Sequence, residues 1–357
     1  MLIHPFDPHL SSHIEAVAAI WNQACGDDLA IAPSFVAFNC QPATGSVQAG
    51  WLALMDDAAA GFVLASALTD DPATSPPEIG WIDALAVAPT FQRRGAGAAL
   101  LAQAEAWLAG QGCSAVRLGG SLRPFAPGLS LELSSEPFFR DRGYRPRATE
   151  DTVWDVAADL AAGVEADLPA GVEASAGVCG ETRLKPRLQT ETRLKPRLQT
   201  VRLAAARERD EPALLAFLQR EFPGRWRFEF QEFRRAGGRM SEYSLLWRGD
   251  PGRAPFVDGF CRIRRRWRYV VDPLDRYFMH RLPTPWGQLG PVGVGQAGRG
   301  QGWGRGLVEF GLARLAGYGV RGCVIDWTTL LDFYARFGFQ PRRGYRVLVK
   351  ALQGTPP

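Results

Sequence analysis

One pattern occurs twice in this chain and restricts the fold more than any other feature of the sequence. An apolar run over 82–88 leads into a turn rich in Arg and Gly, Gln92–Gly97, and a helix is expected over 93–110. A second apolar run over 289–294 precedes a glycine-rich turn, and a helix is expected over 305–317. The two copies lie about 207 residues apart, so the pattern predicts an internal duplication.

Each turn lies where its helix begins, which predicts an anion site. The first turn of a helix presents unpaired backbone N–H groups and the positive end of the helix dipole, which suit a phosphate. Gly95 and Gly97 carry no side chain, so phosphate oxygens can approach the main chain closely. A purely structural glycine turn is the alternative for each copy.

In this setting the turn resembles the acetyl-CoA pyrophosphate loop of the GNAT superfamily of N-acetyltransferases. The resemblance implies that acetyl-CoA is the cofactor, and that the strand before each loop pairs with its pantetheine arm. The residues expected to bind it are Leu85, Ala86, Val87, Gln92, Arg93, Arg94, Gly95, Ala96, Gly97 and Ala98 in the first copy, and Val292, Val294, Arg299, Gly300, Gln301, Gly302, Trp303, Gly304 and Arg305 in the second.

The 357 residues are enough for two domains with separate cores. We expect an α+β fold of two tandem GNAT-like domains, 1–158 and 201–357, each with a mostly antiparallel central sheet flanked by helices. The tandem layout is similar to that of mycothiol synthase. Residues 159–200 are expected to form a basic linker, in which the decapeptide 181–190 is repeated without change as 191–200.

Local patterns predict the other elements. A helix is expected over 12–24, capped by Ser11 or Ser12. Strands at 143–144 and 151–156 are expected to form a hairpin that closes the first domain, and a single strand at 346–352 is expected to end the second.

The segment 331–339 resembles the family's Phe-Tyr-x-x-x-Gly-Phe sequence, which implies a catalytic role for Tyr334. In that family the tyrosine protonates the leaving thiolate; packing in the core is the alternative. The first copy has Phe139 at this place, which cannot donate a proton. The second domain is therefore expected to be the catalytic one.

The general base is expected to be a carboxylate near the cofactor strand. Asp83 lies on that strand in the first copy, whereas the second copy has Gln288, Gly290 and Pro291 there. Asp326, at the end of the next strand, is the candidate in the second copy; it is equally suited to cap the helix that follows.

Composition limits compartment and partners. The six cysteines are scattered without a Cys-x-x-Cys pair, so we expect reduced thiols in a cytoplasmic protein and no metal site. No apolar run approaches the ~20 residues of a membrane span, and no export leader is seen. Residues 1–160 carry a net charge of −10 and the remainder +14. This asymmetry fits division of labour between domains, and no nucleic-acid partner is expected.

The sequence thus predicts an acetyl-CoA-dependent N-acetyltransferase that acts on a primary amine of a small molecule, as a monomer or homodimer. A protein or peptide N-acetyltransferase is one alternative. A non-catalytic acyl-CoA-binding or interaction module is another.

Overall fold

The computed structural model describes residues 1–147, 151–160, 172–175, 200–249, 254–265 and 282–352. The chain divides into two compact units. Unit 1 contains the described residues of Met1–Ala158 and Ile325–Pro357, and unit 2 those of Asp159–Arg265 and Thr284–Val324. The repeated decapeptide lies outside the described residues except for Thr200, so the expected linker stays a prediction.

Seven strands form a sheet in unit 1, in the order β1-β2-β3-β4-β5-β16-β7. Neighbours are antiparallel except β4 and β5, which run parallel. Their bounds are β1 Leu2–Pro5, β2 Ser46–Met55, β3 Ala58–Leu68, β4 Ile79–Val87, β5 Ala115–Leu118, β7 Arg145–Pro146 and β16 Leu348–Ala351. β3 is almost entirely buried, as expected of a central strand covered on both faces.

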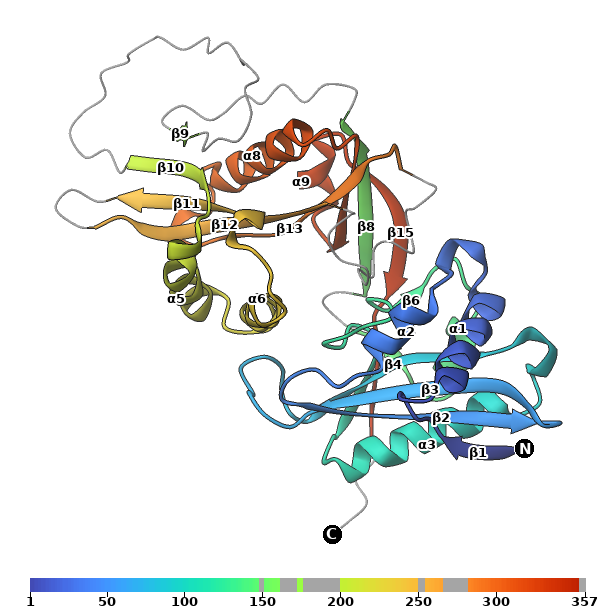
Figure 1. Cartoon of the computed structure of the whole chain (residues 1–357). Helices are drawn as coiled ribbons and strands as arrows, with labels where there is room; N and C mark the ends of the chain where they lie inside the picture. The colour runs from blue at the N-terminus through green and yellow to red at the C-terminus, as the bar shows by residue number, and fades with distance from the viewer. Residues whose placement is uncertain (148–150, 161–171, 176–199, 250–253, 266–281, 353–357) are drawn as a thin grey trace. The chain divides into compact units, whose positions relative to one another are not determined.

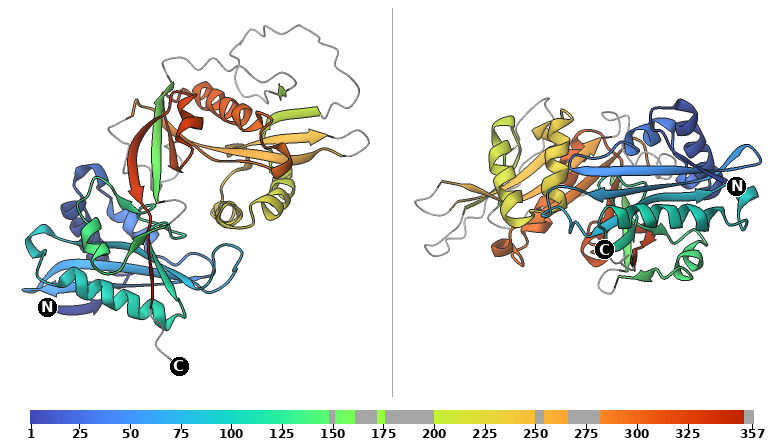
Figure 2. Two further views of the ribbon diagram at one scale, coloured as in Figure 1. Left: turned by 180° about the vertical axis from the view of Figure 1, so that it is seen from behind. Right: turned by 90° about the horizontal axis from the view of Figure 1, so that it is seen from below.

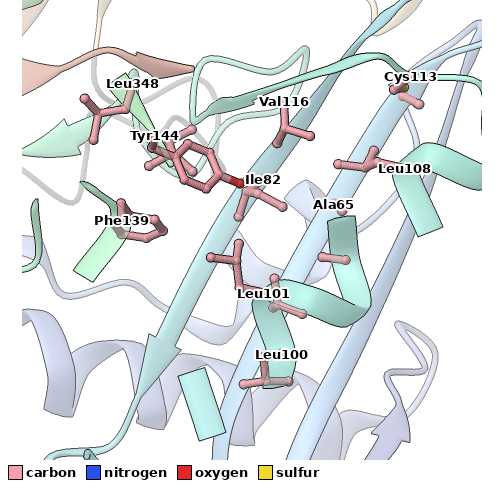
Figure 3. Close-up of a cluster of buried hydrophobic side chains, with 14 of the residues drawn as sticks. Ala65, Ile82, Leu100, Leu101, Leu108, Cys113, Val116, Phe139, Tyr144 and Leu348 are labelled. Atoms are coloured by element: carbon pink, nitrogen blue, oxygen red, sulfur yellow. The ribbon is translucent and has the colours of Figure 1, made fainter. Parts of the chain in front are cut away.

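Helices cover both faces of this sheet (Figure 1): α1 (Ser11–Cys25) and α2 (Pro33–Asn39) one face, α3 (Ala96–Gly110) the other. The apolar stripe of α3 faces Ala65, Ile82 and Val116 of the sheet (Figure 3). α1 buries its own stripe against β2, β3 and β4. The expected serine cap of α1 is wrong: Leu10 is the N-cap residue, and no side chain caps this helix.

The C-terminal strands of the chain belong to unit 1. β16 pairs with β5 and β7, and it ends beside the blue and teal strands in Figure 2. β15 (Gln340–Arg346) pairs with β8 (Thr152–Asp159) and with β6 (Leu129–Ser130). Two expectations are therefore wrong. The expected hairpin does not form, and the expected last strand is two strands interrupted at Val347. In both cases the pairing strands are far apart in the sequence, by roughly 190 to 230 residues.

Unit 2 repeats the layered arrangement. Its strands run in the order β14-β13-β12-β11-β10-β9, with α8 on one face and α5 and α6 on the other (Figure 1). The bounds are β9 Val172–Ser175, β10 Thr200–Ala205, β11 Tyr243–Gly249, β12 Phe256–Arg265, β13 Trp286–Val294, β14 Gly322–Thr328, α5 Glu211–Glu221, α6 Arg225–Arg235 and α8 Trp303–Gly317. Two short helices of unit 1, α4 (Glu136–Arg140) and α9 (Leu331–Ala335), complete the description.

The duplication is visible element by element. β13, α8 and the start of β14 reproduce β4, α3 and the start of β5 with every residue number 207 higher. α3 begins three residues later than expected, because Arg93 and Gly95 adopt left-handed φ values of 60° and 90°. The sequence-based second domain, 201–357, remains a prediction, since residues 325–357 pack with unit 1.

Candidate functional site

The first site begins where two parallel strands part. β4 and β5 pair from Ile79↔Ala115 to Ile82↔Leu118, whereas β4 continues to Val87. The register of β4 against β3 shifts at the same point, because Leu64 pairs with Ala84 and Ala65 with Ile82. Asp83 is the extra residue of this β-bulge. A bulge turns one side chain out of the regular alternation of the strand.

Asp83 is a buried carboxyl with hydrogen bonds from three side chains, those of Gln48, Ser66 and Ser121. Gln48 Nε2 donates to Asp83 Oδ2 at 2.9 Å, and Ser66 Oγ donates to Oδ1 at 2.7 Å. Its exposed fraction is 3%. Burial raises the pKa of Asp83, and the hydrogen bonds oppose part of that rise. A carboxylate with a raised pKa is a stronger base, so this position suits proton abstraction.

The turn after β4 leaves its helix N-terminus open. No side chain caps α3, and a Cβ added at Gly95 would meet nothing within 4 Å. The first backbone N–H groups of α3 therefore face open space, as an anion site requires. Gln92 Nε2 donates to the carbonyl oxygen of Val87 at 2.9 Å, which ties the turn to the end of β4.

Both features open into one cavity of about 920 Å³ within unit 1. Of the sequence-predicted residues, it brings together Asp83, Leu85, Ala86, Val87, Gln92, Arg93, Gly95, Gly97 and Ala98. Arg94 and Ala96 do not line it: Arg94 lies 3.8 Å from Asp56 in an exposed ion pair, and Ala96 is buried. Trp21, Cys25 and Leu29, at the end of α1 and just beyond it, also contribute to the wall.

The short helix α4 lies beside the turn at 92–97. The Phe138 ring lies 3.4 Å from where a Cβ of Gly97 would be, and the Arg142 guanidinium lies 3.9 Å from the centre of that ring. Arg142 therefore brings a positive charge to the cavity beside the open helix N-terminus. Phe139, which stands at the place of the family's tyrosine, packs on Tyr144 and also lines the cavity.

The turn in unit 2 has the same backbone geometry. Gly300 and Gly302 are left-handed, with φ values of 77° and 81°, and no side chain caps α8. Arg299 Nε donates to the carbonyl oxygen of Val294 at 3.5 Å, which reproduces the contact of Gln92 with Val87. The pairing of β13 with β14 ends at Gln288↔Val324, again before β13 ends. The register shift of β13 falls over Gly290 and Pro291.

Aromatic side chains lie over β13. A Cβ at Gly293 would come within 3.0 Å of both Phe222 and Phe260, and the Trp226 ring packs on each of these rings.

The backbone N–H of Gln296 donates to Glu221 Oε2 at 2.9 Å, and this bond lowers the pKa of Glu221. Trp226 thus joins an aromatic cluster, and a carboxylate lies at the start of the second turn.

The residues predicted to act in the second copy have other surroundings. Tyr334 is 6% exposed and packs on Phe333 and Phe339. Asp326 does not cap α9, because Leu330 is its N-cap residue and no side chain caps it; that alternative is wrong. Asp326 instead lies close enough to Asp155 to raise its pKa.

Sequence analysis missed Tyr345 and Asp155. Tyr345, from β15, lines the unit 1 cavity, and its hydroxyl donates to Asp155 Oδ2 at 2.9 Å. Neither residue belongs to a recognisable motif, and they are 190 residues apart. Only the pairing of β15 with β8 brings them together.

Comparison with known families bears on part of unit 1. Residues 15–123, less than half of the chain, match the model of the acetyltransferase (GNAT) family. This part of unit 1 is therefore similar to a GNAT acetyltransferase domain. The match covers α1 through the end of β5, and so includes the bulge at Asp83 and the turn at 92–97.

Solved GNAT structures extend the likeness to the whole chain. The GCN5-related glucosamine N-acetyltransferase region of a fungal multi-domain GH3 β-N-acetylglucosaminidase superposes with a TM-score of 0.77 at 21% identity, covering 98% of this chain and 38% of that one. A GCN5-related N-acetyltransferase from Sphaerobacter thermophilus gives 0.63 at 16%, covering 98% and 95%. A tandem GNAT protein from the clavulanic acid biosynthesis pathway gives 0.59 at 15%, covering 100% and 99%. The fold is that of two tandem GNAT-like domains.

Other comparisons add little. No match was found among curated proteins. Within the described residues, no helix is long and apolar enough to cross a membrane, and no group of three or more His, Cys, Asp and Glu could hold a metal ion. Cys40, Cys113, Cys261 and Cys323 are buried free thiols.

Proposed function

We propose that this protein is an acetyl-CoA-dependent N-acetyltransferase that acts on a primary amine of a small molecule, with the chemistry in unit 1. One observation carries the proposal: a single cavity joins an open helix N-terminus to a buried carboxyl at a strand bulge. The first feature suits the pyrophosphate of the cofactor, and the second suits a base for the amine.

The cavity residues supply the kinds of group that acetyl-CoA would need. The N–H groups at the start of α3 would hold the pyrophosphate, with Arg93 and Arg142 supplying positive charge. The backbone of Leu85–Val87 extends beyond the last β4–β5 pair and would hold the pantetheine arm. When bound, the cofactor supplies an activated acetyl group on a thiol leaving group.

Asp83 would then remove a proton from the acceptor nitrogen. An amine reaches a protein at neutral pH mainly as an ammonium ion, which has no lone pair for attack. The carboxylate of Asp83 takes one proton and frees that lone pair. Gln48 and Ser66 hold the carboxyl in place.

The geometry supports the cavity at Asp83 as the site of the chemistry. The sequence around Tyr334 favours the second copy of the pattern instead. In unit 2 the bulge carries Gly290, which has no carboxylate, and Phe222 and Phe260 crowd Gly293. The retained turn at 299–304 supports a second role for that unit, namely binding acyl-CoA without turnover. The buried free thiols support a reducing compartment such as the cytoplasm.

Titration calorimetry with acetyl-CoA tests cofactor binding. The experiment compares the wild-type protein with Gly95→Glu and Gly302→Glu. A glutamate at either position adds bulk and negative charge where the pyrophosphate would lie. We expect Gly95→Glu to remove the site that supports turnover. No binding by the wild-type protein would sink the transferase proposal and leave the interaction module.

Release of free CoA thiol from acetyl-CoA tests the reaction itself. Glucosamine is the first acceptor to try, because the fungal region of similar fold is a glucosamine N-acetyltransferase region. A polyamine and a short peptide with a free N-terminus complete the panel. Faster release with the peptide than with either small amine would favour the protein N-acetyltransferase alternative.

A further inference from the structure

A buried tyrosine–aspartate pair adjoins the point where β4 and β5 part. Tyr345 of β15 and Asp155 of β8 are 0% and 1% exposed, and the phenol donates to Asp155 Oδ2 at 2.9 Å. The proton chemistry assigned to Asp83 does not use this pair. A buried phenol that is hydrogen-bonded to a buried carboxyl can transfer a proton to a reacting group within hydrogen-bond distance.

A short chain of contacts joins the pair to the site. Gly119 N–H donates to the carbonyl oxygen of Ile82 at 2.9 Å, immediately after the last β4–β5 pair. Gly120 N–H then donates to the carbonyl oxygen of Ala126 at 2.9 Å. Ala126 packs against the hydrophobic cluster of Val153, Tyr345 and Val347. These contacts link the cluster of Tyr345 to the end of the β4–β5 pairing, and Tyr345 lines the same cavity as Asp83.

The groups around Asp155 keep its two protonation states close in energy. Burial raises the pKa of Asp155 to about 7, and the nearby Asp326 adds to the rise. The backbone N–H of Trp327, which donates to Oδ1 at 3.1 Å, the Tyr345 hydroxyl and the positive charge of Arg343 all act in the opposite direction. Near neutral pH, Asp155 can therefore either accept a proton from Tyr345 or return one to it.

We propose that Tyr345, resupplied by Asp155, gives the proton that the departing thiolate of acetyl-CoA takes up in unit 1. This inference rests on the proposed function. The Tyr345 O–H bond breaks as the S–H bond forms, and the Asp155 proton passes to the phenolate oxygen. Over one turnover the acceptor ammonium loses two protons, sulfur gains one, and one leaves to solvent. Asp155 regains its proton from solvent.

The chemistry of the cavity wall favours the phenol for this role. A phenol with a pKa near 10 is closely matched to a thiol with a pKa near 8.5, so the proton transfer is nearly balanced. The serine hydroxyls of the wall, at 130, 134 and 135, are much weaker acids. Phe139, which shares the wall, has no proton to give.

Tyr345→Phe tests the inference, with Tyr144→Phe as a matched control. Both tyrosines are 0% exposed and each donates a hydrogen bond to a carboxylate, Tyr144 to Glu105 at 2.8 Å. Tyr144 belongs to the hydrophobic cluster of Figure 3 and is not part of the cavity wall. For each variant, kcat and its pH profile are measured with glucosamine or the best acceptor of the panel, and the acetyl-CoA Kd is measured by calorimetry.

We expect Tyr345→Phe to lower kcat about 100-fold and to leave the Kd of acetyl-CoA unchanged, whereas Tyr144→Phe changes kcat less than about twofold. We expect kcat of the wild-type protein to fall at alkaline pH as Tyr345 loses its proton, and this fall should disappear in Tyr345→Phe. Asp155→Asn keeps groups that can pair with Tyr345 and Trp327 but cannot pass a proton, so it should lower kcat about tenfold.

Two other results would overturn the inference: a normal kcat in Tyr345→Phe, or an equal fall in both Tyr→Phe variants with the pH profile unchanged. If Tyr345→Phe fails to fold, Asp155→Asn decides the question by the same criteria. A wild-type protein that acetylates no amine contradicts the proposed function. An active wild-type protein with an active Tyr345→Phe contradicts only this inference.

Discussion

Asp83 and Gly290 occupy the same position in two copies of one strand, at the bulges of β4 and β13. The first bulge carries a buried carboxyl held by hydrogen bonds from Gln48, Ser66 and Ser121, whereas Gly290 at the equivalent position has no side chain. The two copies keep the same backbone turn, with left-handed residues at 93 and 95 and at 300 and 302. The duplication has therefore preserved this turn in both units and a candidate base in one.

Asp83→Asn should abolish most of the activity without loss of cofactor binding. The amide fills the same space and can still pair with Gln48 and Ser66, but it cannot take a proton from the amine. We expect kcat to fall at least about 100-fold, with the acetyl-CoA Kd within about twofold of the wild-type value. The control is Asp258→Asn, which replaces a buried carboxyl of unit 2. Equal activity of Asp83→Asn and the wild-type protein would rule out Asp83 as the base.

Tyr334→Phe distinguishes the two candidate sites. The ring keeps its contacts with Phe333 and Phe339, so only the hydroxyl is lost. If the cavity at Asp83 performs the chemistry, kcat should remain within about twofold of the wild-type value. A fall of about 100-fold, with an unchanged melting temperature, would return the catalytic role to the second copy of the pattern, with Tyr334 as its acid.

Asp155 should make the stability of the protein fall as the pH rises. Its pKa is about 7 in the folded protein against an ordinary value of 3.8, so the folded state binds more protons than the unfolded state between these two pH values. Stability from this group is full below pH ~4, is lost as the pH rises toward ~7, and changes little above that. Asp155→Asn should remove this contribution to the slope and raise the melting temperature at pH 8 by a few °C. If the melting temperatures of the variant and the wild-type protein change equally with pH from pH 5 to 8, Asp155 does not titrate as described.

Deletion of residues 348–357 should unfold unit 1. The deletion removes β16 from between β5 and β7, takes away the buried Leu348, and breaks the 2.6 Å ion pair of Lys350 with Glu105. Burial of one leucine alone contributes about 1.5–3 kcal/mol. We expect a large fall in melting temperature and no acetyl-CoA binding in unit 1. Deletion of 353–357 is the control and should change neither, and similar behaviour of the two deletions would contradict the role of β16.

The fold class and the strand–turn–helix at 82–110 in unit 1 were predictable because their signals are local. An apolar strand, a glycine turn and an amphipathic helix lie within 30 residues, and their repetition distinguished them from an ordinary loop. The three-residue error at the start of α3 came from Arg93, whose left-handed conformation is uncommon for a residue with a side chain.

The presence of Tyr345 in the cavity wall could not be predicted in this way. Tyr345 reaches the site only because β15 pairs with β8, and pairing between strands so far apart leaves no periodic signal in either segment. The assignment of catalysis to the second domain stays a prediction, because a tyrosine in a suitable sequence is also a good core residue, and Tyr334 is buried against Phe333 and Phe339.

The position of β16 also governs how the protein is made. Chains are synthesised from the N-terminus, and domains usually fold in that order as they emerge. Here the sheet that carries the turn at 92–97 has a gap between β5 and β7 until β16 is available. A ribosome that has synthesised residues 1–160 has therefore produced no complete unit 1, and the sheet closes only after residues 348–351 have been added.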